Sequence, residues 1–257
     1  MRIVVAYKWA ASPQDASVGA EGAVDWSRAK ASFGEYDAVA AELARRLADA
    51  AGGELVGVSV GGADVVSSLA RKGALSRGLN RAVLVGDAPA EARGPLSTGR
   101  ALAALVDRLG DVDVVLAGDA SVDVAAGVVP GVLAGELGWP TLSQVTAVEP
   151  VEDGLRVTRA VPGGSEVVLA RTPVVLCAAA DAVVARVPGM KDILGAGKKP
   201  VEEVAWADLG LAPAPAPVRS SATRAQGPAR RGVVIDGADP QAAAVELVGA
   251  LRAAGAL

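Results

Sequence analysis

The sequence has no histidine and a single cysteine among its 257 residues. These absences exclude histidine-based catalytic triads, histidine-ligated zinc, disulfide bonds and thiolate-held iron–sulfur clusters within the chain. The one cysteine, Cys177, lies in the apolar run 174–180. We interpret it as a core residue, because a reactive thiolate needs an electropositive and accessible environment. The sequence therefore predicts no metal site.

The sequence also lacks long hydrophobic runs and an excess of basic residues. No apolar run reaches the roughly 18 residues that a membrane helix requires. The amino-terminal stretch MRIVVAYKW is typical of a short strand and lacks the small-residue cleavage site of a signal peptide. A net charge of -4 argues against nucleic acid as a partner, because binding it would require a basic face. We therefore expect a cytoplasmic protein that neither enters a membrane nor binds nucleic acid.

The residues that are present predict an α/β fold. With 51% hydrophobic and 21% charged residues, the chain can bury one full-sized domain and carry an appendage. Continuous apolar strands alternate with amphipathic helices as far as Pro140. The predicted strands are 3–7, 55–60, 82–85 and 111–117, and the predicted helices cover 33–47, 64–76 and a segment that begins at Pro95. This alternation is typical of a Rossmann-like parallel sheet with helices on both faces.

After Pro140 the pattern changes to short strands and turns. Strands are predicted at 144–148, 155–161, 167–170 and 174–178, and Gly163 with Gly164 would form the turn of an appended β-hairpin. Segment 186–200 is so rich in glycine that we assign it no helix.

The C-terminal part is predicted to stand apart from the main domain. The predicted division is a domain at 1–210, a Pro/Ala/Arg-rich linker at 211–232 and an extended C-terminal arm at 233–257. Within the arm we expect a short strand at 233–235 and a helix at 240–254. The arm is too short to form its own core, so it must pack on this domain or on another chain.

The stretch Gly118 to Pro140 carries the clearest functional pattern. A buried strand ends before Gly118, small residues follow, and an apolar helix begins near Gly127. Free main-chain N–H groups would converge at the start of this helix, where the helix dipole is positive, and could bind a phosphate. Because no Lys or Arg is near this stretch in the sequence, the site would suit a monophosphate better than a triphosphate.

The positions of the other strand ends favour the same interpretation. Ligands of parallel sheets bind beyond the carboxyl ends of the strands, and these ends are predicted at 6–8, 60–62 and 118–121. The alternative is an ordinary strand-to-helix connection, because the stretch matches neither GxGxxG nor the P-loop pattern.

Several segments in this order resemble the beta subunit of electron transfer flavoproteins. They are RIVVAYK at the start, ALSRGLNRAVLV from Ala74 to Val85, VDVVLAGDASVDVAAGVVPGVLAGELGWP from Val112 to Pro140, the hairpin RAVPGGSEVVLARTPVVL, then GKKPVEEV and ADLG. The resemblance runs from Met1 to about Gly210. It implies a heterodimer in which an alpha subunit holds FAD. This chain would bind AMP with a structural role, or a second FAD, and would have no catalytic residue. It also implies that electrons come from donor dehydrogenases and that the C-terminal arm packs on the alpha subunit.

The resemblance also implies which residues carry the two functions. The nucleotide-binding positions would be Ala6, Ala31, Ser32, Phe33, Gly34, Val60, Gly118, Asp119, Ala120, Ser121, Asp123, Ala125, Ala126, Gly127, Val128 and Val129. The positions that dock donor dehydrogenases would be Met190, Lys191, Ile193 and Leu194, within the loop 186–199.

The chain departs from the family pattern at two places. Many members have Asn-Pro where this chain has Ala31 and Ser32, and Asn-Gln-Thr where it has 127–129. A phosphate here would be bound by backbone amides and the helix dipole alone. Two other functions stay open: a free-standing adenine-nucleotide sensor of the universal-stress type, and an interaction subunit whose nucleotide site has decayed.

Overall fold

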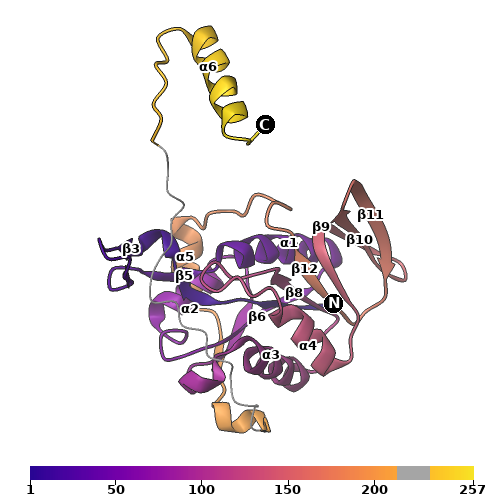
Figure 1. The fold of residues 1–257 in the computed structure, drawn as a ribbon. Coiled ribbons are helices and arrows are strands. Elements are labelled where there is room, and N and C mark those ends of the chain that lie inside the picture. Colours follow the sequence, from indigo (N-terminus) through magenta and orange to yellow (C-terminus); the bar gives the residue numbers. More distant parts are fainter. Residues whose placement is uncertain (213–231) are drawn as a thin grey trace. The chain divides into compact units, whose positions relative to one another are not determined.

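The computed structural model describes residues 1–212 and 232–257 (Figure 1). The chain divides into two compact units. The larger unit contains residues 1–17 and the described residues from 25 to 212, and the smaller unit contains residues 18–24 and 232–257. The predicted linker at 211–232 therefore lies almost wholly outside the described residues.

A nine-stranded sheet forms the centre of the larger unit, in the order β11-β10-β9-β12-β8-β1-β6-β7-β13. From β9 to β13 neighbouring strands are parallel, whereas β9, β10 and β11 pair in antiparallel fashion. The strands are β1 (Arg2–Ala6), β6 (Glu54–Val60), β7 (Arg81–Val85), β8 (Val114–Gly118), β9 (Thr141–Val151), β10 (Gly154–Val161), β11 (Gly164–Ala170), β12 (Val174–Ala178) and β13 (Val201–Glu203). The predicted parallel sheet and its appended hairpin are confirmed.

Helices cover both faces of this sheet, as Figure 1 shows for α1 on one side and α3 with α4 on the other. The helices are α1 (Glu35–Ala51), α2 (Ser68–Leu75), α3 (Pro95–Leu109), α4 (Val129–Leu137), α5 (Met190–Ala196) and α6 (Pro240–Ala253). Along β1, Ile3 and Val5 enter the core beneath α1 and α2, and Val4 enters the core beneath α3 and α4. Because successive side chains point to opposite faces, a strand covered on both sides must be apolar throughout.

The loop after β1 contains short strands that the sequence pattern did not reveal. β2 (Trp9–Ala11) pairs antiparallel with β5 (Ala31–Phe33), and β3 (Ser17–Val18) and β4 (Val24–Asp25) form a second small sheet. Phe33 was expected to begin a helix but belongs to β5. Its apolar side chain has helical spacing with α1, but its backbone pairs with Trp9.

Three further predictions of local structure are wrong. The helix expected at 64–76 begins only at Ser68, because Ser67 caps it and its side chain accepts a hydrogen bond from the N–H of Ala70. The glycine-rich segment 186–200 does contain a helix, α5, whose first turn is held by the Asp192 carboxylate accepting from the Gly189 N–H. Residues 233–235 form no strand, and the side chains of Val233 and Val234 are exposed.

Candidate functional site

A cavity of about 240 Å³ opens at the carboxyl ends of β1, β6 and β8. Its wall is built from the loops that follow these strands, from the loop before α3, and from residues of α1, α3 and α4. The lining residues are Ala6, Tyr7, Lys8, Trp9, Asp37, Val60, Gly61, Gly62, Asp64, Val65, Arg93, Pro95, Thr98, Leu102, Ala117, Gly118, Asp119, Ala120, Ser121, Val124, Ala126, Gly127, Val129 and Pro130. The cavity therefore lies at the edge of the sheet where ligands of parallel sheets bind.

The cavity brings together most, but not all, of the residues expected at a nucleotide site. Nine of them line it: Ala6, Val60, Gly118, Asp119, Ala120, Ser121, Ala126, Gly127 and Val129. Asp123, Ala125 and Val128 belong to the same loop but are outside the lining, and so are the four residues 31–34. Phe33 instead stacks on Tyr7, with ring centroids 4.6 Å apart. Because Tyr7 lines the cavity and Phe33 does not, Phe33 packs against the wall without being part of it.

The loop between β8 and α4 turns through two residues with left-handed backbone, Ala125 (φ 51°) and Gly127 (φ 65°). The N–H of Ala125 donates to the carbonyl of Ser121 at 2.8 Å, which closes the loop on itself. No side chain caps α4, and Pro130 occupies its first turn. The N–H groups of this turn therefore lack a side-chain acceptor at the cavity wall, as the sequence predicted.

Two cationic side chains line the cavity, so the expectation of a site without Lys or Arg nearby is wrong. The Lys8 Nζ donates to both carboxylate oxygens of Asp123, at 2.6 and 2.8 Å. Burial opposes the ionisation of Asp123, but hydrogen bonds from Lys8 and Ser121 outweigh it and lower the pKa of this carboxyl. The pair ties the end of β1 to the loop that precedes α4.

The second cation, Arg93, comes from the loop before α3. Its Nε donates to the carbonyl of Ala88 at 2.9 Å. Its guanidinium lies against Gly62, where an added Cβ would be only 2.8 Å from an Nη nitrogen. Sequence reasoning missed Arg93 because only the packing of its loop against the end of β6 brings it to the cavity.

Asp37 is a further cavity residue that sequence reasoning missed. It is 7% exposed, in the first turn of α1, and its carboxylate accepts the Lys8 N–H at 2.7 Å and the Gly118 N–H at 3.2 Å. A Cβ at Gly118 would lie 2.8 Å from this carboxylate, so glycine is needed for the approach. Asp37 thus joins the ends of β1 and β8 on the cavity floor.

Burial raises the pKa of the Asp37 carboxyl to about 6 from its ordinary value of 3.8, although the two main-chain hydrogen bonds and the nearby Lys8 ammonium oppose the shift. The folded protein therefore holds this proton more tightly than the unfolded chain does. The resulting stabilisation is complete below the ordinary pKa and is lost as the pH rises through about 6.

This shift predicts a pH-dependent difference in stability between the protein and the variant Asp37→Asn, which cannot titrate at this position. From about pH 5 to about pH 8, the free energy of unfolding of the parent should fall by about 1 to 2 kcal/mol relative to that of the variant. Urea denaturation at both pH values measures the difference. A constant difference would show that the buried carboxyl has an ordinary pKa.

A second candidate site is formed by α5, whose apolar side chains face outward. Met190 is 72% exposed, Ile193 40% and Leu194 69%, and Lys191 is also exposed. None of these three apolar residues belongs to the core, and together they form an exposed apolar patch.

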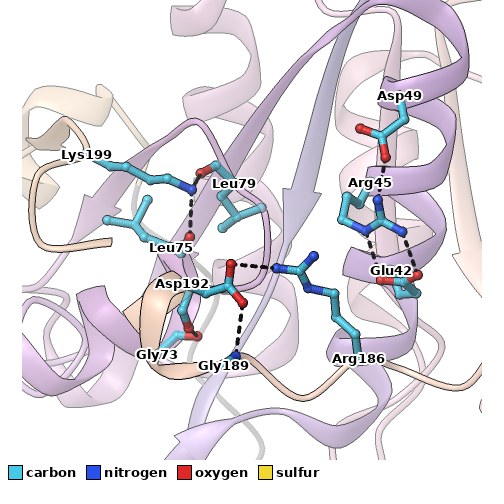
Figure 2. Close-up of polar contacts among 11 residues, drawn as sticks. Glu42, Arg45, Asp49, Gly73, Leu75, Leu79, Arg186, Gly189, Asp192 and Lys199 are labelled. Atoms are coloured by element: carbon cyan, nitrogen blue, oxygen red, sulfur yellow. Dashed lines mark hydrogen bonds and ion pairs between the residues drawn. The ribbon is translucent and has the colours of Figure 1, made fainter. Parts of the chain in front are cut away.

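Polar contacts fix the ends of the segment that carries α5 (Figure 2). Arg186 pairs with Asp192 at 3.1 Å, and Asp192 also accepts the Gly189 N–H. At the other end, the Lys199 Nζ donates to the carbonyl of Leu75, the last residue of α2, at 2.9 Å and to that of Leu79 at 2.6 Å. The exposed apolar patch therefore stands on a braced helix, and Lys199 has a structural role there.

The fold and the cavity define an α/β protein of Rossmann-like architecture with a ligand-sized cavity at the carboxyl edge of its sheet. The model of the family described as Electron transfer flavoprotein domain matches residues 22–209. The chain belongs to this family, whose members are electron carriers rather than catalysts. Among the described helices, none is long and apolar enough to cross a membrane.

Proposed function

We propose that the chain is the beta subunit of a heterodimeric electron transfer flavoprotein. It would accept electrons from donor dehydrogenases and pass them on through an FAD held mainly by the alpha subunit. The redox chemistry would belong to that FAD, and this chain would bind an adenine nucleotide in its cavity, AMP with a structural role or FAD in its place. The observation that carries the proposal is the cavity at the carboxyl ends of β1, β6 and β8 in a chain of this family.

The lining of the cavity is suited to an adenylate. Val60, Val65 and Leu102 supply apolar surface for a base, and the first turn of α4 supplies main-chain donors for a phosphate. Pockets of this kind combine mostly apolar walls with a few polar groups that orient the ligand.

The charges of the lining favour a single phosphate over a triphosphate. The carboxylates of Asp37, Asp64 and Asp119 share the wall with two cations, and one of these, Lys8, is already paired with Asp123. A highly charged ligand would therefore find little compensating positive charge.

The braced helix α5 supports the proposed docking of donor dehydrogenases. Replacing Met190 by aspartate should slow the reduction of the flavin by its donor by at least about tenfold, because a charge would enter the centre of an apolar contact. Stopped-flow absorbance of the assembled heterodimer measures this rate. Met190→Leu, which keeps the apolar surface, should react as the parent does, and an unchanged rate in Met190→Asp would remove this helix from the docking surface.

The C-terminal arm is proposed to pack on the alpha subunit. Helix α6 is capped by Asp239 and has no buried residue, and Val245 is 72% and Val248 38% exposed. Exposed apolar side chains on one helix favour burial against a partner chain.

The proposal is tested by co-expressing the chain with an FAD-binding alpha subunit of the same family. We expect a one-to-one complex that is yellow with FAD and accepts electrons from a dehydrogenase. A chain that does not bind the co-expressed alpha subunit, or that turns over a substrate unaided, would contradict the proposal.

A further inference from the structure

The cavity wall has one cation whose terminal nitrogens are not committed to the protein. Among the described residues, the only polar contact of the Arg93 side chain is the hydrogen bond from its Nε to Ala88, which leaves Nη1 and Nη2 without an acceptor. Asp64 lines the same cavity, but no ion pair joins it to Arg93 in the described part of the chain. Lys8, in contrast, is neutralised by Asp123.

The guanidinium of Arg93 is held in place before any ligand binds. The bond to Ala88 fixes one edge, and the flat face rests on Gly62, where a side chain would leave no room for it. A guanidinium fixed in this way loses little conformational entropy when it binds an anion, and its planar fork matches two oxygens of a phosphate.

The entrance of α4 explains why the site needs such a cation. Gly127, Val128 and Val129 carry no polar side chain, so the helix start offers a phosphate only main-chain donors. Helices α3 and α4 begin next to each other, because Gly99 of α3 lets Val132 of α4 approach its backbone. Arg93, two residues before α3, therefore lines the same cavity as the start of α4.

We propose that Arg93 binds the phosphate of the nucleotide, opposite the main-chain donors of α4, and makes the site specific for adenosine phosphates over adenosine. This inference rests on the proposed nucleotide site. Charged hydrogen bonds between a guanidinium and a phosphate are roughly twice as strong as neutral ones. Arg93 is accordingly a specificity-determining residue, while the base and ribose are bound by the rest of the wall.

Isothermal titration calorimetry of the full chain, freed of bound nucleotide, tests the role of Arg93 with AMP and adenosine as ligands. Arg93→Gln should weaken AMP binding by about 10- to 100-fold and change adenosine binding by less than about twofold. Arg93→Lys, which keeps the charge but not the planar fork of the guanidinium, should bind AMP with an affinity between those of the parent and Arg93→Gln. The control Arg108→Gln, in the last turn of α3 and paired with Glu202 outside the cavity, should bind both ligands as the parent does.

The possible results separate this inference from the proposed function. If the parent binds AMP and Arg93→Gln binds it equally well, Arg93 is not a phosphate ligand and the nucleotide site stands. Equal losses for AMP and adenosine would likewise overturn the specific role of Arg93. If the parent binds neither ligand, the nucleotide site itself is wrong and this inference falls with it. Circular dichroism of each variant shows that the fold is kept.

Discussion

Replacing Ala120 by tryptophan should reduce the affinity for AMP by at least about 100-fold while the chain remains folded. Ala120 is partly buried in the loop after β8 and lines the cavity. An indole in place of its methyl group would fill much of the cavity, whose volume is about 240 Å³, and would leave too little space for a nucleotide. Calorimetric titration with AMP measures the loss, and circular dichroism reports on the fold.

A matched control is the same substitution at an alanine of the same unit that is away from the cavity. Ala50 lies in the last turn of α1, is exposed and does not line the cavity. Ala50→Trp should bind AMP as the parent does. If Ala120→Trp also binds AMP with unchanged affinity, the nucleotide lies elsewhere and the cavity has another role.

Deleting residues 212–257 should abolish stable pairing with the alpha subunit. The deletion removes α6 together with the exposed apolar residues Val233 and Val234, and leaves every residue that lines the cavity in place. We therefore expect the shortened chain to bind AMP but to dissociate from an affinity-tagged alpha subunit during purification. Size-exclusion chromatography with light scattering measures the stoichiometry.

Point substitutions within α6 distinguish the loss of an apolar contact with the alpha subunit from the effect of shortening the arm. Val245→Asp combined with Val248→Asp places two charges on the exposed apolar part of the helix and should weaken pairing by at least about tenfold. The control Gln241→Asp changes a polar position in the first turn and should pair normally. A shortened chain that still co-purifies one to one would show that the arm is not part of the interface.

Much of the fold could be predicted because each central strand is a continuous apolar run. β12 was predicted with its observed bounds, Val174–Ala178, and α3 with its observed start at Pro95. The position of the cavity followed from the same pattern, since the ends of parallel strands meet at one edge of a sheet. Ala6, Val60 and Gly118 are far apart in the chain, yet all three line the cavity.

Two charged residues of the site, Asp37 and Arg93, could not be predicted in this way. Asp37 occupies a helix position where a carboxylate would ordinarily face solvent, and its burial depends on two glycines, Gly34 and Gly118, that leave space beside it. Arg93 reaches the cavity only because Gly62 has no side chain. Such contacts depend on the packing of loops from different strands, which leaves no periodic signal in the sequence.

The assignment of residues 31–34 to the nucleotide site remains a prediction. The structure places them behind the wall, in β5 and at the start of α1, where Gly34 donates its N–H to the carbonyl of Lys8 at 3.0 Å. Their effect on a ligand would therefore act through Tyr7 and Lys8, which do line the cavity.

The most direct test of the account is the identity of the small molecules that the purified heterodimer releases on denaturation, measured by mass spectrometry with quantified standards. The account predicts one AMP for each copy of this chain in addition to the FAD of the alpha subunit. A second FAD instead of AMP would keep the role of beta subunit and change the ligand of the cavity. ATP, or no nucleotide beyond the alpha subunit's FAD, would contradict the account.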